Sequence, residues 1–343
     1  MIVKTQFGTT ADGRTVDQFT LSNTAGMEVD LITYGATVNA IRVPDKAGTF
    51  TDVLIGFDTV AGHEQYSDYQ GNTIGRYANR IAGGVFTLDG VEYHVEKNER
   101  GVTSLHGGGE LSSAVWQAII VDDNAVEMTY VSPDGAKGFP GEVRFRVLFT
   151  LHEDNALRID YKAVSDKKTV INMTNHAYFN LAGAGDILAH TLKVSADAFT
   201  PTDADSIPTG EVRPVEGTPF DFRAAKPIGR DIGAQDPQLL QCRGYDHNFC
   251  LNAGDGPAAE LYDPASGRLL QVFTDLPGIQ IYTGNFLDGT RPGKGGAPII
   301  KHAGVCLETQ CYPNTPNMPA FPSCTVEAGA PYVTSTVFKF SVQ

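Results

Sequence analysis

Short stretches in which apolar and polar residues alternate recur along the whole chain. Residues 157–162 (LRIDYK) alternate throughout and residues 143–151 begin in the same way, so both stretches predict half-buried β-strands. Residues 86–88 and 91–95 also alternate, and the Asp-Gly pair between them favours the type I′ turn of a β-hairpin. Weaker patterns predict further strands at 29–34, 126–131, 279–282 and 333–340.

Helical periodicity is rare in the same sequence. Only residues 60–66 and 238–242 suggest short helical turns, and no helical pattern follows the glycine run 107–109. The 37 glycines and 19 prolines are spread along the chain, which is typical of many short strands joined by turns. Because so few helices cannot cover the strands, the strands must bury their faces on one another. We therefore predict an all-β fold, a large antiparallel β-sandwich with few short helices, formed by residues 1–343 as a single domain.

The charge balance narrows the range of partners. The 343 residues include 26 Lys and Arg against 40 Asp and Glu, which gives a formal net charge of −14. This excess of negative charge disfavours binding to nucleic acid, and anionic lipid surfaces repel it for the same reason. No stretch of about 18 apolar residues predicts a transmembrane helix. We expect a protein that binds neither nucleic acid nor a membrane.

The cysteines and the N-terminus indicate the compartment. Five cysteines, an odd number without a C-x-x-C pair, argue against a disulfide framework and against a structural zinc site. The first residues have no apolar segment behind a basic start, as a secretory signal would. We therefore expect a cytoplasmic location. The sequence leaves open whether the chain is a monomer or a homodimer.

Common cofactor and metal signatures are missing from the sequence. It contains no Walker A motif, no dinucleotide fingerprint on a strand-turn-helix, no H-E-x-x-H pair and no G-x-S-x-G elbow. We expect no cofactor and no metal ion, and a reaction performed by the protein's own side chains.

Six segments combine polar side chains with glycine and aromatic residues more densely than core packing requires. In chain order they are GRYANRI (75–81), SLHGG (104–108), TNHAYFNL (174–181), YDHNF (245–249), QIYTGN (280–285) and GVCLETQ (304–310). Their Asn, Asp, Gln, Arg and His side chains can hydrogen-bond hydroxyl groups, and aromatic rings stack on sugar rings. A neutral polyol is therefore the expected ligand, since a phosphorylated one would require more cations than the two arginines.

Glu308 is the hardest of these residues to explain as purely structural. It ends the apolar run VCLE, which is expected to be buried, and a carboxylate there needs a partner or a shifted pKa. For the other residues an ordinary structural role is the competing interpretation: a core histidine for His176, a loop histidine for His106, ion pairs for Arg76 and Arg80, a turn cap for Asp246 and an outward strand position for Gln280.

Taken together and in this order, the six segments resemble those of the aldose 1-epimerase family, also called galactose mutarotases. The similar stretches are GRYANRI, LHGG, TNHAYFNL, YDHNF, YTGNF and LETQ, and they span nearly the whole chain. The resemblance implies the galactose mutarotase-like supersandwich of stacked antiparallel sheets, with a monosaccharide in an open cleft. It also implies interconversion of the α and β anomers of aldohexoses such as galactose and glucose, without a metal or an organic cofactor.

The resemblance implies a role for each matching residue. The catalytic base is Glu308, the catalytic acid is His176, the second active-site histidine is His106, and the sugar-binding residues are Asn79, Arg80, Asp246 and Gln280. Changing the anomer requires one group that deprotonates the anomeric hydroxyl and another that protonates the ring oxygen. A carboxylate and an imidazolium suit these tasks near neutral pH, with ordinary pKa values of about 4.3 and 6.5. These values predict a bell-shaped pH profile, limited at low pH by Glu308 and at high pH by His176.

Three other functions remain as alternatives. A glycoside hydrolase could use Asp246 and Glu308 as its carboxylate pair, although hydrolysis has no need of His176. A non-catalytic sugar-binding module on the same fold could keep the binding residues and lose the acid or the base. A mutarotase for hexose 6-phosphates would need a cationic cluster for the phosphate, and the segments supply little beyond Arg76 and Arg80.

Overall fold

The strands form three large antiparallel sheets within the described part of the chain. The computed structural model describes residues 1–66 and 68–343. The first sheet takes the N-terminal strands in chain order: β1 (Ile2–Thr9), β2 (Thr15–Ser22), β3 (Glu28–Ile32), β4 (Thr37–Pro44) and β5 (Phe50–Asp52).

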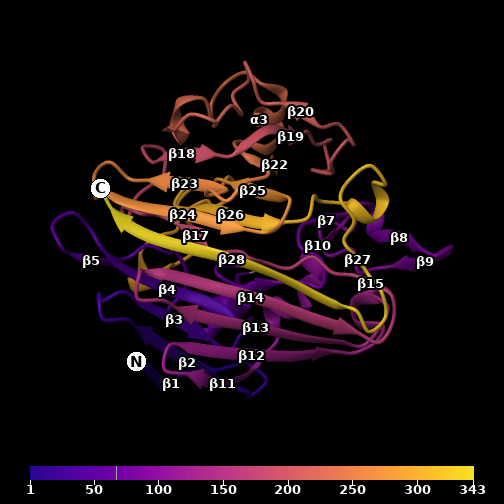
Figure 1. Ribbon diagram of the computed structural model, residues 1–343, viewed down its shortest axis with the longest axis horizontal. Helices are drawn as coiled ribbons and strands as arrows, with labels where there is room; N and C mark the ends of the chain where they lie inside the picture. The colour runs from indigo at the N-terminus through magenta and orange to yellow at the C-terminus, as the bar shows by residue number, and fades with distance from the viewer. Residues whose placement is uncertain (67) are drawn as a thin grey trace.

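The second sheet has nine strands and crosses the view of Figure 1 from β11 at the bottom to β18 near the top. Its order is β11 (Gln117–Asp122), β12 (Ala125–Ser132), β13 (Val143–Leu151), β14 (Ala156–Ser165), β28 (Pro331–Val342), β24 (Arg268–Thr274), β23 (Ala259–Tyr262), β18 (Thr191–Val194) and β21 (Lys226–Pro227). The C-terminal strand β28 therefore lies in the middle of the sheet, between β14 and β24.

The third sheet has six strands and holds the residues on which the function depends. Its order is β17 (Tyr178–Phe179), β26 (Val305–Gln310), β25 (Gly278–Tyr282), β22 (Asp246–Leu251), β19 (Ala196–Thr200) and β20 (Arg213–Pro214). All six residues of β26 are buried, as expected for a strand with neighbours on both sides and covered faces.

The remaining elements are short. Two-stranded ribbons pair β6 (Thr73–Ile74) with β16 (Thr174–Asn175), β7 (Arg80–Ile81) with β10 (Ser104–Leu105), β8 (Val85–Leu88) with β9 (Val91–His94), and β15 (Thr169–Val170) with β27 (Thr325–Val326). The α-helices are α1 (Val60–Gln65), α2 (Glu110–Ser113) and α3 (Pro237–Cys242). The 3-10 helices are η1 (Ala82–Gly84), η2 (His106–Gly109), η3 (Ala136–Gly138), η4 (Ile228–Arg230), η5 (Lys294–Gly296) and η6 (Thr315–Asn317).

One large hydrophobic core joins the three sheets. Leu31 of the first sheet, Phe149 of the second and Ile281 of the third belong to the same cluster of buried side chains. The ring of Phe179 on β17 lies 5.0 Å from that of Phe338 on β28, which is a contact between the third and second sheets. This face-to-face packing of antiparallel sheets is the predicted β-sandwich.

Most elements predicted from the sequence are confirmed. The hairpin of β8 and β9 turns at Asp89 and Gly90 with φ values of 50° and 79°, as a type I′ turn requires. The two predicted helical turns are α1 and α3. A short helix, α2, begins at Glu110 directly after the glycine run, where the sequence shows no helical pattern. Four residues form barely one turn, which is too short to show a periodic pattern.

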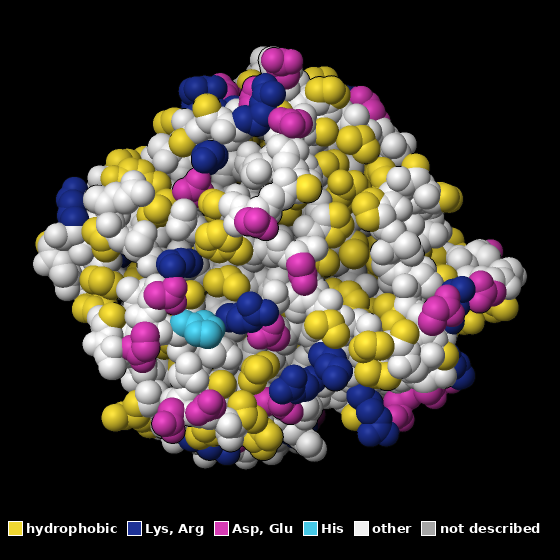
Figure 2. All heavy atoms as spheres, in the orientation of Figure 1, with side chains coloured by type: hydrophobic (Ala, Val, Ile, Leu, Met, Phe, Trp, Pro, Cys, Tyr) yellow, Lys and Arg dark blue, Asp and Glu magenta, His cyan; other side chains and the backbone are white. Residues whose placement is uncertain are grey.

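The surface is mixed in charge and in polarity. On the face shown in Figure 2, acidic and basic side chains are interspersed among apolar ones. Across residues 1–66 and 68–343, no helix combines the length and the apolar character that crossing a membrane requires.

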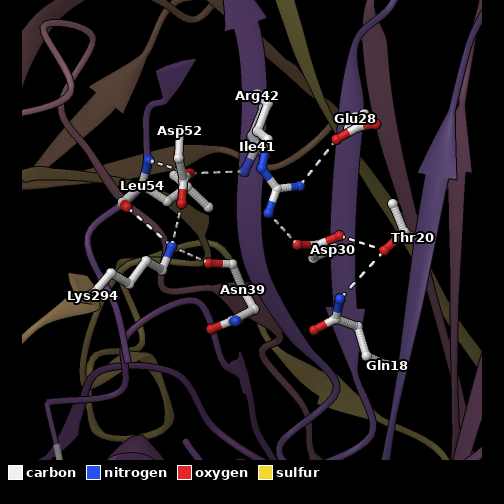
Figure 3. A network of polar contacts seen from close by, with 10 residues as sticks. All are labelled: Gln18, Thr20, Glu28, Asp30, Asn39, Ile41, Arg42, Asp52, Leu54 and Lys294. Carbon is white, nitrogen blue, oxygen red and sulfur yellow. Dashed lines mark hydrogen bonds and ion pairs between the residues drawn. The ribbon is translucent and has the colours of Figure 1, made fainter. Parts of the chain in front are cut away.

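The long loop between β25 and β26 is tied to the first sheet by Lys294 (Figure 3). Its Nζ donates to the carbonyl oxygens of Asn39 and Leu54, at 2.5 and 3.2 Å, and pairs with Oδ2 of Asp52 at 2.6 Å. Asp52 is fixed in turn, because its Oδ1 accepts the N–H of Ile41. The loop that leads into β26 is thus anchored on β4 and β5.

Candidate active site

A cavity of about 190 Å³ opens beside the end of the third sheet. This volume lies below the roughly 300–1,000 Å³ of typical pockets for drug-sized molecules, so the cavity suits a small ligand. Its walls are formed by Asp68, Tyr69, Asn79, Arg80, Glu99, Leu105, His106, His176, Tyr178, Asp246, Tyr282, Phe286 and Glu308.

Glu308 is held on β26, where it is only 2% exposed. Its strand partner on β25 is Gln280. Among the described residues, Oε2 of Glu308 has no hydrogen-bond partner. A buried carboxyl oxygen without a donor is costly, and this cost is a feature of functional sites.

His176 lies in the short connection between β16 and β17, facing Glu308. Its backbone N–H donates to the carbonyl of Asn72 and its carbonyl accepts the N–H of Gly71, which fixes the ring's position. Nε2 of the ring lies 3.6 Å from Oε1 of Glu308, and Nδ1 lies 3.5 Å from Sγ of Cys306. The side chains of His176 and Glu308 are 6% and 3% exposed, so the two groups meet in a nearly dry environment.

Burial reverses the ordinary order of the two pKa values. Desolvation raises the pKa of Glu308 well above its usual value, and the nearby Asp246 carboxylate raises it further. Desolvation also lowers the pKa of His176 to about 4. When the pair holds a single proton, that proton is therefore favoured on the carboxyl group, not on the imidazole.

His106 presents a hydrogen-bond donor to the cavity. Its Nδ1 accepts the backbone N–H of Asn79 at 3.2 Å, so the neutral ring must have its proton on Nε2. Burial lowers the pKa of His106 well below 6.5, and the neighbouring His176 and Arg80 lower it further. The loop that follows His106 can pack against the backbone of Gly75 because residue 107 is a glycine. A Cβ at Gly107, whose φ is +63°, would collide with that backbone.

The tautomer of His106 bears on metal binding. The ligand atoms of His106, His176 and Glu308 lie within 4.8 Å of one another, a spacing that a divalent metal could bridge. A metal on His106 would need the lone pair of Nε2, which is the nitrogen that has the proton. This donor set therefore favours proton transfer and hydrogen bonding over metal coordination.

Arg80 enters the cavity already paired with Glu99. Its Nε and Nη2 donate to the two oxygens of Glu99, each at 2.8 Å, and the hydroxyl of Thr103 adds a third donor to that carboxylate at 2.6 Å. Burial alone would lower the pKa of Arg80, but the bonds to Glu99 and the charge of Asp246 outweigh it and raise that pKa. Arg80 stays a cation whose charge is largely neutralised.

Asp246, on β22, is oriented by a chain of amides. Nε2 of Gln280 donates to Oδ1 of Asp246 at 2.7 Å, and Oε1 of Gln280 accepts from Nε2 of Gln310 at 3.2 Å. Burial raises the pKa of Asp246, and the charge of Arg80 partly offsets the rise. Gln280 is buried and not an outward strand residue.

The structure brings six of the seven predicted site residues to the cavity wall. These are Asn79, Arg80, His106, His176, Asp246 and Glu308. Gln280 is near Glu308, as expected, but it lies behind Asp246 and is not among the lining residues. Its buried amide therefore acts on the site through Asp246.

Sequence reasoning missed several lining residues. Glu99 stands in a turn with no local pattern, and its importance appears only through Arg80. Tyr178 and Tyr282 belong to the TNHAYFNL and QIYTGN segments but received no role. Phe286, 51% exposed, forms part of the rim. Arg76 is fully buried and donates to oxygens of residues 132–141, so its role is structural.

Comparison with known proteins shows similarity along almost the whole chain. The family model described as aldose 1-epimerase matches residues 17–339. A galactose mutarotase from Bos taurus is 44% identical over 333 residues, which cover 96% of this chain and 95% of the relative. An aldose 1-epimerase from Escherichia coli is 39% identical over 336 residues, 96% of each chain.

The fold is shared with solved structures. The crystal structure of a galactose 1-epimerase from Lactobacillus acidophilus superposes with a TM-score of 0.89 at 28% identity, covering 100% of this chain and 99% of the other. With a family match across almost its whole length, this chain belongs to the aldose 1-epimerase family.

Proposed function

We propose that this chain interconverts the α and β anomers of aldohexoses such as galactose and glucose, as a single domain of residues 1–343. Glu308 acts as the base and His176 as the acid. The observation that supports these roles is the 3.6 Å separation of Nε2 of His176 and Oε1 of Glu308 in the wall of a sugar-sized cavity. Membership of the aldose 1-epimerase family supports the reaction class, an isomerisation.

The reaction needs one proton removed and one proton delivered at neighbouring oxygens. The Glu308 carboxylate takes the proton of the anomeric hydroxyl, and the His176 imidazolium gives its proton to the ring oxygen as the bond between that oxygen and the anomeric carbon breaks. The open-chain aldehyde rotates about the adjacent carbon–carbon bond. Ring closure then reverses both transfers on the other face, so the two groups exchange roles and the net proton count is unchanged.

The favoured resting state has the proton on the opposite partner. A carboxylic acid with a neutral imidazole contains the same number of protons as a carboxylate with an imidazolium. A bound sugar that donates its anomeric hydroxyl to the orphan oxygen of Glu308 stabilises the carboxylate. Sugar binding therefore favours transfer of the shared proton to His176, where the reaction needs it.

Four other wall residues hold the ring in place. His106 donates through Nε2, Arg80 donates through the hydrogens that Glu99 leaves free, Asp246 accepts from hydroxyl groups, and Asn79 completes the wall. Fixing the ring so that only the anomeric carbon and ring oxygen face the acid–base pair lowers the entropy cost of the transition state.

The alternatives receive less support. A hexose 6-phosphate would require free cationic groups, but Glu99 neutralises Arg80, and Arg76 is buried away from the cavity. A glycoside hydrolase has no use for an imidazole facing its carboxylate. A sugar-binding module on the same fold would differ from the proposed enzyme only in lacking mutarotase activity, which polarimetry measures.

The proposal extends to the setting of the enzyme. All five cysteines are free and buried, a state typical of a reducing compartment, which supports a cytoplasmic location. The proposal includes a monomer or a homodimer as the state of the enzyme.

Polarimetry tests the proposal directly. Freshly dissolved α-D-galactose or α-D-glucose should reach the same final rotation faster with the protein than without it. Glu308→Gln and His176→Asn should each lower the catalysed rate by about 10²–10⁴-fold. A folded protein that accelerates no simple aldose would overturn the proposal in favour of a binding module.

A surface variant controls for handling and folding. Glu327→Gln removes a carboxylate whose side chain is 70% exposed and pairs with Lys168, and neither residue lines the cavity. It should keep the activity of the unmodified protein. Equal activity of Glu308→Gln and Glu327→Gln would contradict the role of Glu308.

A further inference from the structure

The cavity wall has more negative than positive side chains. Four carboxyl groups line it, from Asp68, Glu99, Asp246 and Glu308, against the single guanidinium of Arg80. Glu99 is paired with Arg80, and Asp68 is paired with Arg291. Two carboxyl groups therefore remain without an ion pair to Lys or Arg in the described structure: Asp246 has no ion pair, and Glu308 faces only the imidazole of His176.

Both of these unpaired carboxyl groups are buried in the cavity wall. Asp246 is 9% exposed and Glu308 is 2% exposed. Oε2 of Glu308 lacks any hydrogen-bond donor among the described residues, so the site contains an acceptor that only a ligand or solvent can satisfy. A hydroxyl group satisfies it with a hydrogen bond, whereas an ammonium group adds a compensating charge at low dielectric.

We propose that the cavity binds cationic analogues of the sugar, six-membered polyhydroxylated amines in which a protonated nitrogen replaces the ring oxygen, more tightly than it binds the neutral sugar ring. This inference rests on the proposed function, because it takes the ring oxygen of the substrate to face His176 and Glu308. A ring of this kind without an anomeric hydroxyl cannot open. It is therefore a competitive, unreactive ligand.

The same balance of charge predicts which sugars are rejected. A phosphate or carboxylate on the sugar would enter a wall in which Asp246 and Glu308 are unpaired and Arg80 is already occupied by Glu99. An added negative charge would meet the Asp246 carboxylate and no free cation in a buried setting, which disfavours binding. Hexose 6-phosphates and hexuronic acids should therefore compete poorly with galactose.

Two ligands that differ in one atom provide the test. In 1-deoxygalactonojirimycin the ring has a protonated nitrogen, and in 1,5-anhydro-D-galactitol it has an oxygen, while the other hydroxyl groups match. Isothermal titration calorimetry in mildly acidic buffer, where the amine is protonated, should give a Kd at least about tenfold lower for the amine. The amine should also inhibit galactose mutarotation competitively.

Variants locate the source of the preference. Asp246→Asn and Glu308→Gln should each bring the ratio of the two Kd values closer to one, because each removes an unpaired carboxyl group. Glu327→Gln, on the surface, should leave the ratio unchanged. A preference that persists in both cavity variants would show that it arises elsewhere and would overturn the inference.

The outcomes separate this inference from the proposed function. If the protein accelerates mutarotation but binds the amine no more tightly than the anhydro sugar, the inference alone fails. If neither ligand binds and no aldose is mutarotated, both proposals fail. Tight binding of the amine by a protein without mutarotase activity would support a cation-selective sugar site and refute the proposed catalysis.

Discussion

Nε2 of His176 lies 3.6 Å from Oε1 of Glu308, and the strand and connection that hold the two residues remove both from water. Contact with Cys306 behind the imidazole leaves Nε2 directed toward the carboxyl group. Desolvation acts oppositely on the two groups, since it favours the neutral form of each. The pair is thus a carboxyl group that resists ionisation beside an imidazole that resists protonation.

The first prediction concerns the pH dependence of kcat/KM. The reaction requires one proton on the pair, so activity should fall at low pH when His176 also gains a proton, with its pKa of about 4, and at high pH when Glu308 loses its raised-pKa proton. This assignment of the limbs is the reverse of the one expected from the ordinary pKa values. Initial rates across the pH range should give a bell whose acidic limb lies near pH 4.

Infrared spectroscopy can assign the proton of the pair in protein to which no sugar is added. In mildly acidic buffer the unmodified protein should show the carbonyl band of a protonated carboxyl group that is missing from Glu308→Gln. No difference between the two spectra in this region would contradict the reversed pKa order, whatever the shape of the kinetic profile.

The second prediction is that Glu308→Gln makes the protein more stable at neutral pH. A carboxyl whose folded-state pKa is raised above its unfolded value of 4.5 stabilises the fold only while protonated, so stability is lost as the pH rises through the folded pKa. A neutral amide does not ionise, so the variant loses no stability in this way as the pH rises. Thermal unfolding should show the variant ahead by roughly 2–4 °C at neutral pH. This difference in thermal stability should shrink below pH 4.5. A variant less stable than the unmodified protein at every pH would refute the prediction.

The sequence predicted the elements whose signal is local. The strands β13 and β14 alternate along their length, and the Asp-Gly turn between β8 and β9 requires positive φ angles that this pair adopts readily. Glu308 also stood out, because a carboxyl in an apolar run needs an explanation. The resemblance to one family, based on six ordered segments, supplied the remaining predicted site residues.

The features that the sequence did not reveal depend on contacts between distant segments. Glu99 matters because β7 brings Arg80 against it, and nothing near residue 99 indicates that pairing. The side chain of Gln280 turns to Asp246 on the neighbouring strand, so its place behind the cavity wall is a property of the sheet register. Desolvation, which reverses the pKa order, likewise depends on the packed structure.

The third prediction concerns the loop that Lys294 anchors to the first sheet. Its ammonium bonds three oxygens on β4, β5 and the residues after them, and the loop it holds includes Phe286 at the cavity rim. Lys294→Met should lower stability by about 1.5–3 kcal/mol, typical for hydrogen bonds to a charged group, and raise KM with little change in kcat. Lys339→Met, which removes an exposed pair with Asp154, is the control. An unchanged KM would show that the anchor does not position the rim.

The last prediction concerns the pair formed by Arg80 and Glu99, in which Glu99 both orients Arg80 and neutralises its charge. Glu99→Gln replaces a bidentate, charge-assisted contact with a neutral amide, so Arg80 loses its orientation and keeps an uncompensated charge. Removing one partner of a buried pair costs about 3–5 kcal/mol, and part of this cost should appear as a lower Tm. The KM for galactose should rise more than kcat falls, because ring binding is lost while His176 and Glu308 stay in place. Inhibition by glucose 6-phosphate should strengthen, since the freed guanidinium can now meet a phosphate.

Glu96→Gln is the control, at a position three residues before Glu99 in the sequence. It removes the exposed pair with Lys137 and should change neither the KM for galactose nor the inhibition by glucose 6-phosphate. If the Glu99 variant binds the phosphosugar no better than the unmodified protein, neutralisation of Arg80 is not what selects the neutral sugar.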